Sequence, residues 1–298
     1  MLVTGARGQV GAEVARRFEG RAVVIAHDRA MLDLASPAAI AEAVRAARPD
    51  VIVNAGAYTA VDRAESEPDV AHAVNAIAPG VLAEEAKRAG ALLVHFSTDY
   101  VFDGTKAGPY VEDDATHPLG AYGRTKLEGE QRVIASGCRH LVLRTSWVYG
   151  PHGKNFMLTM LRLAQTRDEL RVVDDQRGAP TSSASLARLL AEMLAPGGGE
   201  IARPQVDRVA QSSGLYHSSA QGETTWFGFA RAIFAAAAER PGAVPRMPRL
   251  VAISTREYPT PARRPANSVL SGERLHATFG VRIPDWRHGL AESVSALD

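Results

Sequence analysis

The sequence has a single cysteine, no long apolar run and almost no excess of charge. With only Cys138 present, no internal disulfide can form within the chain, and this composition suits the reducing cytoplasm, where we expect the protein to work. No apolar stretch reaches about 18 residues, so we expect no membrane span, and glycines interrupt the first apolar run, which is unlike a signal peptide. A net charge of +1 favours neither nucleic acid nor an anionic membrane as the main partner.

The sequence does contain a regular alternation of short apolar runs and helical patterns. Its 298 residues are 46% hydrophobic, which is enough for a substantial core. Because the apolar runs do not alternate with polar residues, both faces of the resulting sheet are expected to be buried. The sequence therefore predicts an α/β fold, a Rossmann-type doubly wound parallel sheet. The predicted strands cover residues 1–4, 22–26, 50–55, 91–96 and 140–147, with helices ending at residue 18 and over 37–47, 69–88 and 122–136.

The second half of the sequence is less regular. Helices are predicted over residues 156–166, 183–194 and 226–239, and a strand over 170–173. The change of pattern after Gly150 predicts a first domain over 1–150. Residues 151–298 are predicted to form mainly a smaller α/β lobe, with some segments returning to the first domain.

A glycine-rich turn, GARGQVG over residues 5–11, follows the first strand and opens a helix. Gly5 permits a tight turn, Gly8 lets the backbone approach a pyrophosphate, and Gly11 allows close packing of helix on strand. The helix N-terminus adds free N–H groups and a favourable dipole. The spacing alone also fits an ordinary turn, but its place between strand and helix predicts that residues 1–150 bind NAD(P).

An acidic residue is expected near the end of the second strand, where it would bind the ribose hydroxyl of NAD. Asp28 lies there, and Arg29 follows it directly. The carboxylate favours NADH, whereas the guanidinium would hold the additional phosphate of NADPH. Each residue alone also fits a surface ion pair. The sequence therefore predicts use of NADPH or NADH.

A tyrosine and a lysine four residues apart, Tyr122 and Lys126, share one face of a predicted helix. Tyrosine has an ordinary pKa of about 10, and a nearby ammonium group would lower it. Ser97 and Thr98 follow the fourth strand, where a hydroxyl would polarise a substrate carbonyl. Each motif alone also fits a plain helix face or a turn. In this order they indicate a nicotinamide-dependent carbonyl reductase.

At this point the sequence resembles the extended short-chain dehydrogenases/reductases and, more narrowly, the dTDP-4-dehydrorhamnose reductase family. The resemblance covers nearly the whole chain. Its most specific segments are AYTAVDRAE (57–65) and STDYVFDG (97–104), and further segments are YGRTKLEGE (122–130), LRTSWVYG (143–150), DQRGAPT (175–181) and RRPANSVL (263–270).

The resemblance implies reduction of the C4 ketone of dTDP-4-dehydro-L-rhamnose to dTDP-L-rhamnose with NADPH or NADH. It also implies that the lobe after residue 150 binds this nucleotide sugar. The implied catalytic residues are Thr98, Tyr122 and Lys126. The implied cofactor-binding residues are Gly5, Gly8, Gln9, Val10 and Gly11 at the pyrophosphate, Asp33 and Leu34 near the adenine, and Ala55, Ala57, Tyr58 and Lys126 farther along. The implied neighbours of the sugar or its nucleotide are Thr59, Asp99, Phe102 and Trp147.

Some members of this family bind magnesium through glutamates at a dimer interface. Glu13 matches one such position, but residues 285–290 contain no glutamate, and the nearest is Glu292. The sequence therefore predicts no complete metal site. A homodimer stays open at this point.

Two alternatives to this function remain at the level of the sequence. The first is another reductase or an epimerase for nucleotide sugars, because fold and catalytic residues do not separate these activities. The second is a regulatory subunit that binds a nucleotide without turnover. A broken catalytic triad would favour the second alternative, and here the triad is intact.

Overall fold

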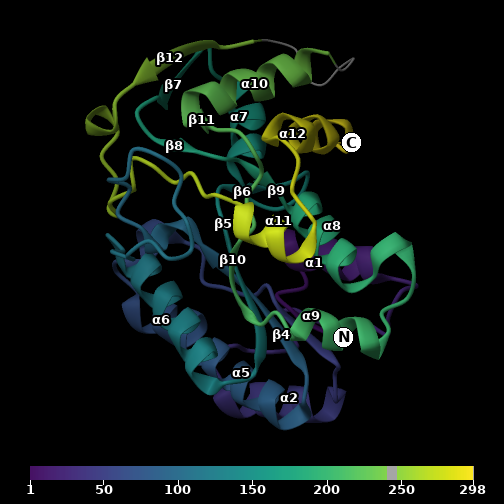
Figure 1. Ribbon diagram of the computed structural model, residues 1–298. Coiled ribbons are helices and arrows are strands. Elements are labelled where there is room, and N and C mark those ends of the chain that lie inside the picture. The colour runs from purple at the N-terminus through teal and green to yellow at the C-terminus, as the bar shows by residue number, and fades with distance from the viewer. Residues whose placement is uncertain (240–246, 298) are drawn as a thin grey trace.

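A six-stranded sheet lies at the centre of the computed structural model, which describes residues 1–239 and 247–297 (Figure 1). All neighbouring strands in this sheet run parallel, in the order β10-β5-β4-β3-β1-β2. The prediction of a Rossmann-type parallel sheet is confirmed. The strands are β1 (Leu2–Thr4), β2 (Ile25–His27), β3 (Val51–Asn54), β4 (Leu92–Thr98), β5 (Arg139–Thr145) and β10 (Gly214–His217).

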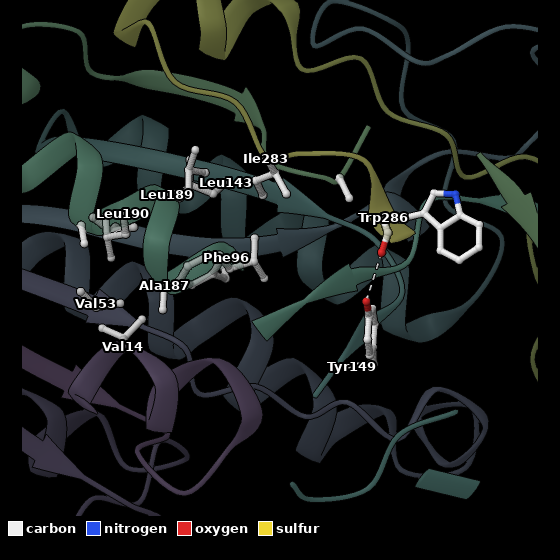
Figure 2. Packing of buried hydrophobic residues seen from close by; sticks show 14 of the residues in the cluster. Val14, Val53, Phe96, Leu143, Tyr149, Ala187, Leu189, Leu190, Ile283 and Trp286 are labelled. Carbon is white, nitrogen blue, oxygen red and sulfur yellow. Dashed lines mark hydrogen bonds between the residues drawn. The ribbon is translucent and has the colours of Figure 1, made fainter. Parts of the chain in front are cut away.

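Helices cover both faces of this sheet. Side chains alternate between the faces of a strand, so Val3 and Val53 pack in one buried cluster while Leu2 and Ile52 pack in another. The first cluster includes side chains of α1 (Gln9–Phe18) and α8 (Ser183–Leu194), and Figure 2 shows part of it. The second includes side chains of α2 (Pro37–Ala47), α5 (Ala78–Ala89) and α6 (Ala121–Ser136). This is the doubly wound arrangement that uninterrupted apolar strands predict.

The order of the strands reverses at β1, which has β2 on one side and β3 on the other. In open parallel sheets a ligand binds at such a reversal, beyond the carboxyl ends of the strands. The glycine-rich turn at residues 5–11 begins directly after β1. The topology therefore brings the turn to the place where a dinucleotide is expected.

Besides the fifth strand, which ends at Thr145 rather than at residue 147, two elements differ from the sequence prediction. The second strand lies at Ile25–His27 rather than over 22–26. The helix predicted over 69–88 is divided into α4 (Pro68–His72), a π-helical turn (Ala73–Ile77) and α5. Pro79 explains the second difference, because it has no N–H to donate to the carbonyl four residues earlier and so favours a local change of helical pattern.

The second half of the chain contributes to two regions. Strand β10 joins the main sheet, and helix α8 lies in its covering layer. Figure 1 shows β7 (Glu169–Val173), β12 (Arg249–Ile253) and α10 (Trp226–Ala238) gathered at the other end of the molecule from α2 and α5. The division of function at residue 150 stays a prediction. The remaining elements are α3 (Val61–Ala64), β6 (Val148–Tyr149), α7 (Phe156–Ala164), β8 (Arg177–Gly178), β9 (Thr181–Ser182), α9 (Arg203–Ala210), β11 (Thr224–Thr225), α11 (Glu273–Phe279) and α12 (Trp286–Ser295).

Helix α12, near the C-terminus, packs against the first of these two buried clusters. The Tyr149 hydroxyl donates to the Trp286 carbonyl at 3.4 Å, which ties the segment after β5 to the start of α12 (Figure 2). Trp286 is 2% exposed and meets Phe229 edge to face at 5.8 Å. Over the described ranges, no helix combines the length and the apolar character needed to cross a bilayer.

The close approach at Gly5 gives a stability prediction. Gly5 has φ +68°, and a Cβ there would lie 2.6 Å from Gly56 Cα, whereas Gly20 has φ +73° and open space around it. We expect Gly20→Ala to lower the free energy of unfolding by about 1 kcal/mol through its backbone conformation alone. Gly5→Ala should lower it by roughly 1–3 kcal/mol more through the clash. Urea unfolding of both variants measures this difference, and equal losses would contradict it.

Candidate active site

One large cavity of about 1310 Å³ opens beyond the carboxyl ends of β1, β3, β4 and β5. Every residue predicted to bind cofactor or substrate lines it, except Gly11 and Phe102, and the three predicted catalytic residues line it as well. The predicted residues at its wall are Gly5, Gly8, Gln9, Val10, Asp28, Arg29, Asp33, Leu34, Ala55, Ala57, Tyr58, Thr59, Thr98, Asp99, Tyr122, Lys126 and Trp147.

The glycine-rich turn forms one end of this cavity. The Gly8 N–H donates to the Gly5 carbonyl at 2.8 Å, which closes a tight turn before α1. Gly11 is buried, and a Cβ there would lie 2.2 Å from the Gly5 carbonyl oxygen. Gly11 therefore serves the packing of helix against strand, as its place in the motif predicts, and does not reach the cavity itself.

Asp28 follows β2 at the same end. Its Oδ1 accepts from the N–H groups of Ala30 (2.9 Å) and Met31 (3.1 Å), and its Oδ2 accepts from Arg7 Nε at 2.7 Å. Arg29 is exposed at the wall of the cavity. The carboxylate thus already has three partners. The sequence reading missed Arg7, although this residue stands in the middle of the glycine-rich turn.

Thr98 and Tyr122 meet at the centre of the cavity wall. Thr98 is the last residue of β4, and Tyr122 lies in the first turn of α6, where the neighbouring Thr98 hydroxyl acts to lower the pKa of Tyr122. The Thr98 hydroxyl also lies 3.0 Å from Asp99 Oδ1, to which it donates. The Tyr100 ring approaches Tyr122 edge to face at 5.5 Å. The fold therefore brings together the hydroxyl groups that the sequence placed far apart.

Lys126 is fully enclosed one helical turn after Tyr122. Its Nζ donates to the Phe96 carbonyl at 2.6 Å and lies 3.4 Å from His95 Nε2. Burial lowers the pKa of Lys126 to about 8, although the Glu130 carboxylate raises it. Burial, and then the charge of Lys126, hold the pKa of His95 well below its usual range, so this imidazole is neutral.

The expected lowering of the tyrosine pKa is not present in this structure. Burial raises the pKa of Tyr122 to about 12, with the Thr98 hydrogen bond acting in the opposite direction and the Asp99 charge adding to the rise. The physical reason is that the Lys126 ammonium points at the Phe96 carbonyl. Tyr122 consequently holds its proton throughout the neutral pH range.

Asp99 is a buried carboxylate beside these hydroxyls. Desolvation raises its pKa to about 6, although hydrogen bonds from Ser268 and Thr98 favour the charged form. Strongly perturbed groups in a cleft are typical of functional sites. Asp99 therefore adds a group that titrates near neutral pH to the wall of the cavity.

Phe102 does not border the cavity, in contrast to the sequence prediction. Its side chain is fully buried, stacks on the Tyr110 ring at 4.1 Å and lies under the Arg144 guanidinium at 5.0 Å. The STDYVFDG segment bends after Thr98 into a short 3-10 turn, which carries Phe102 into a separate small core with Val101. Phe102 is therefore a packing residue here.

Several residues that the sequence reading gave no role also line the cavity. Tyr100 and Gly56 stand beside predicted residues, whereas Gln176, Trp226 and Arg264 come from the second half of the chain. Arg264 is tied to the first half by a 2.9 Å ion pair with Asp62. The resembling segments DQRGAPT and RRPANSVL contain Gln176 and Arg264, but nothing in their spacing indicates these contacts.

The two glutamates considered as magnesium ligands, Glu13 and Glu292, form ion pairs with other side chains instead. Glu13 pairs with Arg16 at 2.5 Å, and Glu292 pairs with Arg188 at 2.8 Å and with His288 at 3.2 Å. Over residues 1–239 and 247–297, no group of three or more acidic, histidine or cysteine side chains is placed to hold a metal. Glu13 and Glu292 are therefore engaged in ion pairs within this chain.

The comparisons with known proteins concern the whole chain. The family description "RmlD substrate binding domain" matches residues 1–298. The dTDP-4-dehydrorhamnose reductase of Burkholderia thailandensis is 51% identical over all of this chain and 98% of its own length.

Solved structures agree with this relationship. A dTDP-4-dehydrorhamnose reductase of Clostridium acetobutylicum superposes with a TM-score of 0.88 at 38% identity, over 99% of this chain and 98% of its own. One of Bacillus anthracis, solved in complex with NADP, superposes with a TM-score of 0.86 at 33% identity, over 98% and 97%. With a site of this geometry and relatives matched from end to end, the chain belongs to the dTDP-4-dehydrorhamnose reductase family.

Proposed function

We propose that this chain reduces the C4 ketone of dTDP-4-dehydro-L-rhamnose to dTDP-L-rhamnose with NADPH or NADH. One observation carries the proposal: Thr98, Tyr122 and Lys126 all line one cavity that reaches the glycine-rich turn, in a chain of this family. Hydroxyl, phenol and ammonium beside a dinucleotide cradle suit hydride transfer to a carbonyl better than any hydrolytic chemistry.

The cavity residues divide the work of the reduction. NADPH or NADH, when bound, would supply the hydride for the carbonyl carbon. Tyr122 would give its proton to the carbonyl oxygen, and the Thr98 hydroxyl would turn its proton from Asp99 Oδ1 to that oxygen as negative charge develops on it. Lys126 would hold the nicotinamide ribose and would stabilise the phenolate that remains. Together these steps add one hydride and one proton to the ketone.

We expect the cofactor and the nucleotide sugar to occupy different parts of the cavity. Gly5, Gly8, Gln9 and Val10 would hold the pyrophosphate, and the residues after β2 and β3 would hold the adenosine and nicotinamide halves. Asp99 and Trp147 would border the sugar. We also propose that residues 151–298 supply most of the substrate side. A cytoplasmic location and a homodimer stay predictions.

The direct test is a reductase assay on the dTDP-4-keto sugar, with NADPH and NADH offered separately and the product identified by NMR. The expected result is cofactor oxidation with dTDP-L-rhamnose as product. Epimerisation without net oxidation of cofactor would instead favour the related epimerases, and nucleotide binding without any turnover would favour a regulatory subunit.

Replacing the proton donor should slow the reaction. We expect Tyr122→Phe to lower kcat by roughly 100-fold or more with little change in cofactor affinity, because a positioned general acid is lost. Tyr216→Phe is the matched control, since the Tyr216 hydroxyl donates to the Ser212 carbonyl outside the cavity. Steady-state kinetics decide the matter, and near-normal kcat in the Tyr122 variant would refute this role.

The cofactor preference should depend on Arg29. We expect Arg29→Ala to weaken NADPH binding several-fold more than NADH binding, because only NADPH carries the phosphate that a guanidinium can hold in a bidentate manner. Fluorescence titration with both cofactors gives the two affinities. Arg16→Ala, which removes an arginine outside the cavity, should change neither. Equal losses for NADPH and NADH in the Arg29 variant would show that Arg29 does not bind the phosphate.

The pH dependence should report Lys126. Its ammonium is present below a pKa of about 8 and is lost above it, while Tyr122 stays protonated. We therefore expect kcat for reduction to fall as pH rises through about 8. In Lys126→Arg the side chain keeps its charge over the whole pH range measured, so the remaining activity should no longer fall near pH 8.

Lys87→Arg is the control for this profile, because Lys87 donates to the Ser136 carbonyl outside the cavity. The measurement is kcat at saturating substrates between about pH 7 and pH 10. A limb near pH 8 that is the same in wild type and in Lys126→Arg would show that another group titrates.

A further inference from the structure

Trp147 has a backbone conformation that tryptophan rarely adopts. Its φ is +48°, in the left-handed region, which costs a side chain with Cβ about 1–2 kcal/mol. Trp147 stands two residues after Thr145, and Thr145 pairs with Thr98 in the register of β4 and β5. The unusual conformation therefore occurs beside the catalytic hydroxyls, on a side chain that lines the cavity.

A second tryptophan stacks on the Trp147 ring. The ring of Trp226 lies parallel to it, with centroids 3.6 Å apart and 7° between the planes. Trp226 is the first residue of α10, where the Thr225 hydroxyl caps the helix by accepting from the Gly228 N–H at 2.9 Å. The cap fixes the start of the helix, and the stack thereby fixes the Trp147 ring.

The DQRGAPT segment over residues 175–181 supplies the remaining contacts. A Cβ at Gly178 would lie 2.4 Å from Trp147 Cε2, so only glycine allows the ring to lie this close. The Thr181 N–H donates to the Trp147 carbonyl at 3.2 Å. Gln176 Oε1 accepts from the Trp226 indole N–H at 3.2 Å. The same segment thus holds both tryptophans.

Burial distinguishes this pair from ordinary core packing. Trp147, Trp226 and the Gln176 side chain all line the cavity, and both tryptophans are only half-buried. Gln176 is itself fixed, because its Nε2 donates to the Thr255 hydroxyl at 3.0 Å. A partly buried pair of stacked indoles, held by a buried amide, presents a rigid apolar wall to whatever enters this part of the cavity.

We propose that Trp226 is a positioning residue for the nucleotide-sugar substrate: it holds Trp147 in its left-handed conformation as a fixed wall of the substrate site, and Gln176 sets the orientation of the Trp226 ring. This inference rests on the proposed function. A wall that is rigid before binding lowers the entropic cost of ordering a flexible nucleotide sugar. Stacked aromatic pairs are worth about 0.5–1.5 kcal/mol beyond their area, which corresponds to about two- to tenfold in affinity.

The test compares Trp226→Leu with Trp226→Phe. In Trp226→Leu we expect the KM for the nucleotide sugar and the Kd of dTDP to rise about tenfold, while the NADPH Kd stays unchanged. Trp226→Phe keeps a flat ring and should recover most of the loss. Stacked indoles couple in circular dichroism, so the bisignate indole signal should disappear in both variants.

Trp286→Phe is the matched control. It also removes one indole, but Trp286 lies outside the cavity and its edge-to-face partner is Phe229 rather than a ring of the stacked pair. This variant should keep the coupled signal and the wild-type KM. Wild-type KM and dTDP affinity in Trp226→Leu would overturn the inference, as would equal losses in Trp226→Leu and Trp286→Phe. If the wild type does not reduce the keto sugar, the proposed function fails, and dTDP affinity still decides the role of Trp226.

Discussion

A buried chain of hydrogen bonds across the carboxyl ends of β4, β3 and β1 connects the two halves of the candidate site. Lys126 Nζ lies 3.4 Å from His95 Nε2, His95 Nδ1 lies 2.9 Å from Asn54 Nδ2, and the Thr4 hydroxyl donates to Asn54 Oδ1 at 2.7 Å. The Gly56 N–H then donates to Thr4 at 3.3 Å, beside the glycine-rich turn. Because an unpaired polar group in such a place costs about 1–3 kcal/mol, these side chains fix one another.

These hydrogen bonds explain why Lys126 is enclosed in the protein rather than paired with the Tyr122 hydroxyl. The sheet offers Lys126 a carbonyl and a neutral imidazole, and both compensate for burial of its charge. Tyr122 is left with a raised pKa. A proton donor for a reduction needs its proton before the hydride moves, so this suits the proposed direction of the reaction. Stabilisation of the phenolate matters afterwards, when the oxidised nicotinamide also carries a positive charge.

The features that could be predicted from the sequence are those that a local pattern of residues determines. Strands β1, β3, β4 and β5, the glycine-rich turn and the start of α6 follow from apolar runs and short motifs, and their meeting point follows from parallel topology. The buried position of Phe102 could not be predicted in this way. It depends on contacts with Tyr110 and Arg144, and the spacing of these residues in the sequence does not indicate the contacts. Trp226 was likewise out of reach, since its contact with Trp147 depends on how α10 packs across the cavity.

The end of the cavity at β2 shows how a structure narrows an ambiguous motif. In the sequence, Asp28 favours NADH and Arg29 favours NADPH, and nothing there decides between the two. In the fold, the Asp28 carboxylate accepts from two backbone N–H groups and from Arg7, so its charge is already compensated and its oxygens are occupied. The guanidinium groups of Arg7 and Arg29 then stand at this rim together with the carboxylates of Asp28 and Asp33. Because both arginines are exposed, their attraction for the extra phosphate of NADPH would be screened by salt.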